Sequence, residues 1–89
     1  MKHRLLFVDD DINYLTAVRG YFEAREFLVT TASSGEESLQ IVLKEPEAFS
    51  VAVVDYQMKG MNGLETVVQL RKINPDLTYW YFQRWGTIQ

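Results

Sequence analysis

Four apolar residues, 51–54, run directly into Asp55, and a glycine-punctuated loop and a helical pattern follow. An unbroken apolar run of this length predicts a strand that is covered on both faces of a sheet. Asp55 would then stand at the carboxyl end of a buried strand, which is where open α/β sheets place their ligands and chemistry. This stretch constrains both the fold and the position of a site.

The same arrangement occurs near the start of the chain, where the run 4–8 leads into Asp9, Asp10 and Asp11. If the two strands are neighbours, both groups of carboxylates meet at one edge of the sheet. Asp11 is also placed to cap a helix over 12–25, because its side-chain oxygen can accept hydrogen bonds from the first free N–H groups.

The rest of the chain continues the alternation of strand and helix. β-branched residues within 26–32 predict a second strand. Ser34 and Glu37 match a capping box, in which Ser34 caps a second helix and Glu37 reaches back. A third helix is expected over 64–72, and aromatic residues predict a fourth strand over 77–85. This alternation predicts an α/β fold with a parallel sheet, helices on both faces and right-handed crossovers.

Composition fits a single domain spanning residues 1–89, which is short beside the roughly 100–150 residues of a typical domain. The net charge of −3 gives no reason to expect binding to nucleic acid or to an anionic membrane. There is no cysteine, and no apolar run approaches the ~18 residues that a membrane span needs. The basic N-terminus precedes too short an apolar run for a signal peptide, so we expect a cytoplasmic protein.

Asp9, Asp10 and Asp55 together suggest a metal site. Crowded carboxylates repel one another, and a hard divalent cation such as Mg²⁺ relieves that repulsion. With the metal bound, one carboxylate can attack a phosphoryl group while the metal offsets charge on the transferring oxygens. We expect Asp55 to be the nucleophile, Asp9 and Asp10 to hold the metal, and Gln57 to supply a backbone carbonyl.

Each acidic group also has a simpler interpretation. Asp9, Asp10 and Asp11 alone describe a solvated, capped helix start equally well. Asp55 alone is more simply a strand-end residue that opens a turn. The coincidence of both groups in one strand–helix chain favours the site.

Four segments resemble the receiver domain of two-component response regulators. They are LLFVDDD at 5–11, TASSGEESL at 31–39, VAVVDYQMKGMNGLE at 51–65 and LRKINPDL at 70–77. The resemblance implies a flavodoxin-like sheet of order 2-1-3-4-5, Mg²⁺ as cofactor and a histidine kinase as phosphodonor. It places the phosphoacceptor at Asp55, the acidic pair at Asp9 and Asp10, and the metal-facing carbonyl at Gln57.

The chain departs from this family in two places. Lys59 stands where the family usually has proline, and its simplest interpretation is a solvated loop cation. The family also has a hydroxyl residue at the end of the fourth strand, where Gln83 falls here, while Thr87 belongs to the following loop. The fourth helix, the fifth strand with its lysine and the fifth helix have no counterpart. We therefore expect a truncated receiver of about four strands, in the order 2-1-3-4, with three helices.

In such a truncated sheet the fourth strand would be an edge strand, and edge strands offer unpaired backbone groups to other chains. Aromatic residues, which are typical interface anchors, are frequent in it. They are Tyr79, Trp80, Tyr81, Phe82 and Trp85. We therefore expect a homodimer through this strand. The alternative is an ordinary buried strand of a monomer.

Two functions of different kinds follow from these patterns. The first is a phosphoacceptor receiver in a histidine-to-aspartate phosphorelay, impaired by truncation. The second is a self-associating scaffold, derived from a receiver by engineering or recombination and without signalling activity. We do not expect an enzyme: a phosphatase would need an acid–base residue, and the single histidine, His3, precedes the first strand.

Overall fold

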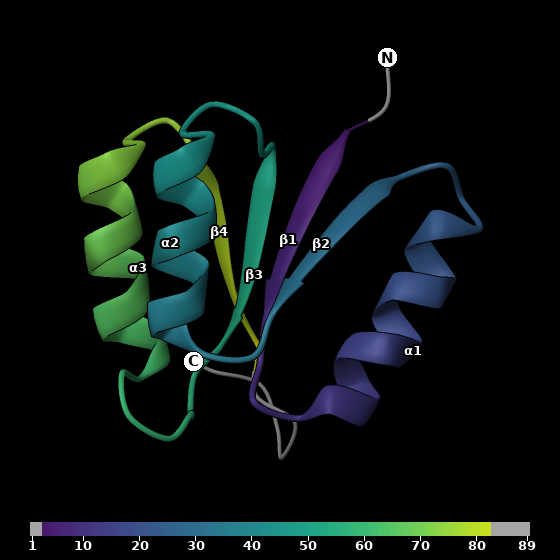
Figure 1. Ribbon diagram of the computed structural model, residues 1–89, viewed down its shortest axis with the longest axis horizontal. Coiled ribbons are helices and arrows are strands. Elements are labelled where there is room, and N and C mark those ends of the chain that lie inside the picture. The colour runs from purple at the N-terminus through teal and green to yellow at the C-terminus, as the bar shows by residue number, and fades with distance from the viewer. Residues whose placement is uncertain (1–2, 83–89) are drawn as a thin grey trace.

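The computed structural model describes residues 3–82 of the chain (Figure 1). Within these residues strands and helices alternate in the order β1 (Arg4–Val8), α1 (Ile12–Glu23), β2 (Leu28–Ala32), α2 (Gly35–Lys44), β3 (Val51–Asp55), α3 (Gly63–Ile73) and β4 (Thr78–Phe82). The longest helix, α1, has 12 residues, and no helix in this part of the chain combines the length and apolar character needed to cross a membrane.

The strands form one parallel sheet in the order β2-β1-β3-β4, which confirms the predicted fold and strand order. β1 and β3 are therefore neighbours, although α1, β2 and α2 separate them in the sequence. Their register pairs Val8 with Val54, so Asp9 and Asp55 follow at the same level. This register brings the two acidic groups to one edge of the sheet.

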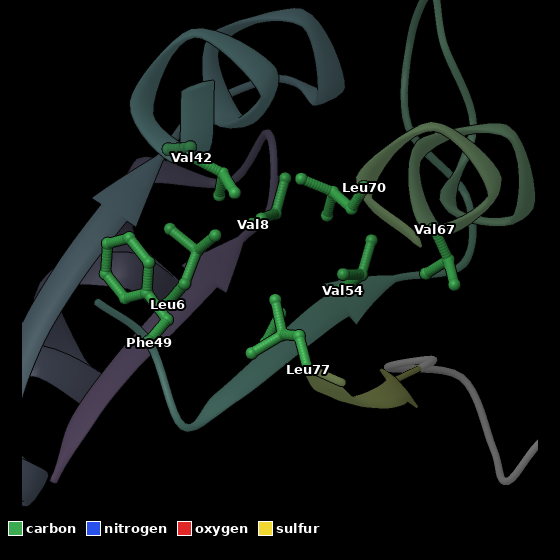
Figure 2. Packing of buried hydrophobic residues seen from close by; sticks show 10 residues of the cluster. Leu6, Val8, Val42, Phe49, Val54, Val67, Leu70 and Leu77 are labelled. Atoms are coloured by element: carbon green, nitrogen blue, oxygen red, sulfur yellow. The ribbon is translucent and has the colours of Figure 1, made fainter. Parts of the chain in front are cut away.

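The sheet lies between two helical layers. α2 and α3 cover one face and α1 covers the other (Figure 1). Alternate strand residues point to opposite faces, so Leu6 packs in the α2–α3 layer while Leu5 and Phe7 pack toward α1. The larger cluster, shown in Figure 2, includes Leu6, Val8, Val42, Phe49, Val54, Val67, Leu70 and Leu77.

The first two helices begin at the predicted capping side chains. Asp11 accepts hydrogen bonds from the backbone N–H groups of Asn13 and Tyr14, and Ser34 accepts one from the N–H of Glu37 at 3.0 Å. The carboxylate of Glu37 reaches back as expected, but one residue further than a capping box requires. It accepts from the backbone N–H and hydroxyl of Ser33, just beyond the end of β2.

Two predicted element boundaries are wrong by two residues. α1 ends at Glu23 instead of residue 25, and β2 begins at Leu28 instead of residue 26. The cause is a tight reversal: Glu26 has a left-handed φ of 69°, and the N–H of Phe27 bonds back to the carbonyl of Phe22 at 3.1 Å. Such a residue ends a helix because the backbone turns out of the helical path.

The predicted fourth strand is only partly described. β4 covers Thr78–Phe82, and Gln83, Trp85 and Thr87 lie outside the described residues. The Asn74 side chain holds the turn before β4, since it accepts a hydrogen bond from the N–H of Asp76 at 3.0 Å.

Candidate phosphoacceptor and metal site

Three carboxylates meet at the carboxyl ends of β1 and β3. Asp9, Asp10 and Asp55 each offer one oxygen, and these oxygens all lie within 4.8 Å of one another. Asp9 and Asp10 follow β1 directly, and Asp55 is the last residue of β3. The parallel pairing of the two strands therefore creates the cluster that the sequence predicted.

The three side chains differ in their contact with solvent. Asp9 is 1% exposed and Asp55 is 4% exposed, while solvent reaches Asp10. Burying carboxylates close together is costly unless a positive charge or hydrogen bonds compensate. An all-oxygen donor set of this kind fits a hard divalent cation such as Mg²⁺, which binds through one or two carboxylates and keeps several waters.

Backbone amides hold two of these carboxylates in place. The N–H of Asp11 donates to Oδ1 of Asp9 at 2.8 Å, and the N–H of Lys59 donates to Oδ2 of Asp10 at 3.2 Å. The N–H of Asp9 itself bonds the carbonyl of Ala32 at 3.1 Å, which ties the end of β1 to the end of β2. The acidic edge is thus held by the segment after β1, by the end of β2 and by the loop after β3.

The loop between β3 and α3 is tightly closed at its far end. The N–H of Gly63 donates to the carbonyl of Tyr56 at 3.0 Å, and a Cβ on Gly63 would overlap the carbonyl oxygen of Asp55. Asn62 and Glu65 form a full capping box at the start of α3. Sequence reasoning missed this box, although the spacing of Asn62 and Glu65 carries its signal.

Gln57 lies in the same loop, two residues after Asp55, and is exposed. The acidic cluster consists of Asp9, Asp10 and Asp55, and the role of the Gln57 carbonyl as a metal ligand stays a prediction.

The aromatic residues of β4 fall on both faces of the sheet. Trp80 pairs with Val53 and is 64% exposed, so its side chain is not buried as that of an interior strand residue would be. Tyr81 lies on the opposite face, where its ring meets that of Tyr56 edge to face with centroids 5.9 Å apart. Tyr56 directly follows the candidate acceptor, so this pair links β4 to the loop of the site.

Tyr79 is more buried than Trp80 and Tyr81. Its hydroxyl donates to the carbonyl of Asn74 at 3.0 Å, and the guanidinium of Arg71 lies 5.3 Å from its ring centroid. Burial raises the pKa of Tyr79 above its ordinary value, and the charge of Arg71 offsets part of that rise. This side chain acts as a structural anchor between α3 and β4.

Comparison with known proteins defines the class that this fold and site indicate. The family model described as the response regulator receiver domain matches residues 5–87. The chain belongs to the response regulator receiver domain family, which is a family of signalling domains.

The curated relatives are regulatory proteins. The chain is 37% identical over 84 residues to the photosynthetic apparatus regulatory protein RegA of Cereibacter sphaeroides, covering 94% of this chain and 45% of that protein. It is 37% identical over 71 residues to a CpxR homolog, a transcriptional regulatory protein of Haemophilus influenzae, covering 80% of this chain and 30% of that protein. The chain therefore spans less than half the length of the curated relatives it matches.

Solved structures agree on the fold. A response regulator receiver domain protein from Clostridium thermocellum superposes with a TM-score of 0.86 at 25% identity, covering 91% of this chain and 64% of that chain. The response regulator TrrA from Thermotoga maritima, solved in complex with Mg²⁺ and BeF, gives a TM-score of 0.82 at 28% identity, covering 93% of this chain and 70% of that chain.

Proposed function

We propose that this chain accepts a phosphoryl group on Asp55 with Mg²⁺ held at the same edge of the sheet. The observation that carries the proposal is the convergence of three carboxylate oxygens within 4.8 Å at the ends of two adjacent parallel strands. Asp9 and Asp10 would hold the cation, together with the backbone carbonyl of Gln57. Bound Mg²⁺ would offset negative charge on the transferring phosphoryl oxygens.

The transfer itself is a displacement at phosphorus. A carboxylate oxygen of Asp55 forms the new O–P bond, and the bond from phosphorus to the donor's leaving atom breaks. The electron pair of that bond leaves with the donor, which takes up a proton from water. Asp55 suits the role of nucleophile because it is the last residue of β3 and is 4% exposed, so the strand fixes its backbone beside the other carboxylates.

The phosphodonor follows from the family to which the chain belongs. It would be a histidine kinase in a cytoplasmic phosphorelay. The relatives named as a transcriptional regulatory protein and as a photosynthetic apparatus regulatory protein support a role in signalling.

Incubation of the chain with a small-molecule phosphodonor and Mg²⁺, followed by intact-mass measurement, tests the acceptor. The parent should gain the mass of one phosphoryl group, and Asp55→Asn should gain none. Asp76→Asn is the matched control, because Asp76 lies in the exposed turn between α3 and β4 and should leave the gain unchanged. An equal gain in Asp55→Asn would show that another group is modified.

A second candidate function is self-association, for which the exposure of β4 is the specific observation. Within the described residues β4 pairs with β3 on one side, and its Trp80 is 64% exposed. Exposed aromatic side chains on an edge strand favour contact with another chain. We propose that a second copy of the 89-residue chain meets this edge, and that the homodimer is a property separate from phosphoryl transfer.

The two candidate functions depend on different residues. Phosphoryl transfer requires Asp55 and Mg²⁺ and does not require Trp80. Self-association requires Trp80 and is indifferent to Asp55 and to Mg²⁺. Mass measurement with phosphodonor and the molar mass in solution therefore judge them independently.

A further inference from the structure

One contact joins the loop after the candidate acceptor to the acidic pair. The backbone amide of Lys59 donates to Oδ2 of Asp10 at 3.2 Å, although 49 residues separate the two in the sequence. Asp10 is the carboxylate of the cluster that solvent reaches. It is therefore less enclosed by the protein than Asp9 and Asp55, which are 1% and 4% exposed.

We propose that the backbone amide of Lys59 is a positioning group for Asp10. A solvent-accessible aspartate samples several rotamers, and ordering it when a cation binds costs free energy. A hydrogen bond that already holds the carboxylate lowers this cost, as partners of metal ligands commonly do. The inference rests on the Mg²⁺ site proposed above and assigns a partner to one of its ligands.

The loop geometry explains how a backbone group can serve this purpose. The loop is closed by the hydrogen bond from Gly63 to Tyr56, and it turns at Gly60, which has a φ of 74°. The amide of Lys59 is placed by this backbone path and not by its exposed side chain. Any residue that keeps the N–H should therefore position Asp10, whereas proline, which has no N–H, should not.

Calorimetric titration of the chain with MgCl₂ separates the amide from the ammonium group. Lys59→Ala keeps the N–H, so its affinity for Mg²⁺ should stay within about twofold of the parent. Lys59→Pro removes the N–H and should weaken binding about threefold to tenfold, the range expected for one hydrogen bond of ordinary strength. Circular dichroism melts establish that each variant is folded.

The outcomes of this titration distinguish the inference from the proposed function. Equal affinities for the parent and Lys59→Pro would overturn the positioning role while leaving the metal site intact. Equal weakening in Lys59→Ala and Lys59→Pro would assign the effect to the ammonium group and would also overturn it. A parent that binds no Mg²⁺ would overturn the metal site itself and the inference with it.

Amide hydrogen exchange measured by NMR gives a second test that does not need the proline variant. Without metal, the Lys59 amide should exchange about threefold to tenfold more slowly in the parent than in Asp10→Ala, because the acceptor is lost. The Gly63 amide, which bonds Tyr56, is the internal control and should not change.

Addition of Mg²⁺ to the parent tests whether the cation and the Lys59 amide act on Asp10 together. Coupling between two sites is reciprocal, so a cation that binds the positioned Asp10 should slow exchange of the Lys59 amide further. Faster exchange on adding Mg²⁺ would show that the cation and the amide compete for the same oxygen. That result would overturn the proposal.

Discussion

At the residue scale, Gly63 shows how closely the backbone approaches the candidate acceptor. A Cβ at this position would overlap the carbonyl oxygen of Asp55 and would lie 2.8 Å from Cα of Tyr56. Both of these atoms belong to the backbone, so no side-chain rotation can relieve the contact. Gly20, inside α1, is the opposite case. Apart from the nearby backbone of its own helix, no heavy atom lies within 4 Å of a Cβ added there.

We predict that Gly63→Ala lowers the free energy of unfolding by about 1–3 kcal/mol, since the loop must shift to admit the methyl group. Gly20→Ala should instead raise it by up to ~1 kcal/mol, because alanine is the better helix former. Urea denaturation followed by circular dichroism measures both variants. Similar changes in the two would contradict the close approach at Gly63.

At the scale of the element, α3 has two roles: it covers one face of the sheet, and it closes the loop of the candidate site. Its Leu70 is fully buried in the larger cluster, next to Val8 and Val54 in the close-up of Figure 2. Its first residue, Gly63, closes the loop of the site. The packing of α3 therefore fixes the loop that carries Lys59 and Gln57.

We predict that Leu70→Ala lowers the free energy of unfolding by about 2–5 kcal/mol, because it removes buried contacts and leaves a cavity. Leu43→Ala is the matched control: Leu43 is 55% exposed on α2, and its truncation should change stability by no more than ~0.5 kcal/mol. Chemical denaturation measures both. A cost for Leu43→Ala as large as that for Leu70→Ala would contradict the layer assignment.

At the scale of the whole molecule, the two faces of the sheet are covered to different extents. α2 and α3 lie on one face, and α1 alone lies on the other within residues 3–82 (Figure 1). Trp80 pairs in register with Val53, whose side chain packs toward the α1 layer, and this places the exposed indole on that less covered face. Burying an exposed aromatic side chain against a second copy would favour association.

Light scattering on a sizing column should therefore give the molar mass of a dimer for the parent chain and a shift toward monomer for Trp80→Ala. Tyr21→Ala is the control, since Tyr21 is 53% exposed on α1 and lies in another element. A monomeric, folded parent would count against self-association. An equal shift in both variants would place the contact elsewhere than β4.

The element order, the parallel sheet and the candidate site residues all follow from local patterns in the amino-acid sequence. Apolar runs specified the strands, since residues 5–8 and 51–54 have no polar side chain on either face. Aspartates placed directly after those runs had to meet once the strands were neighbours. The cap of α3 at Asn62 was also readable, because its pairing with Glu65 depends only on local spacing.

Other features depend on contacts between distant parts of the chain, which local sequence patterns do not specify. The end of α1 depends on the left-handed turn at Glu26, and the exposure of Trp80 depends on which elements cover the sheet. The bond from Lys59 to Asp10 joins two loops 49 residues apart, and the sequence suggested only a solvated cation there. Local spacing specifies helices, strands and caps, whereas the packing of the whole chain decides which loop amide faces which carboxylate.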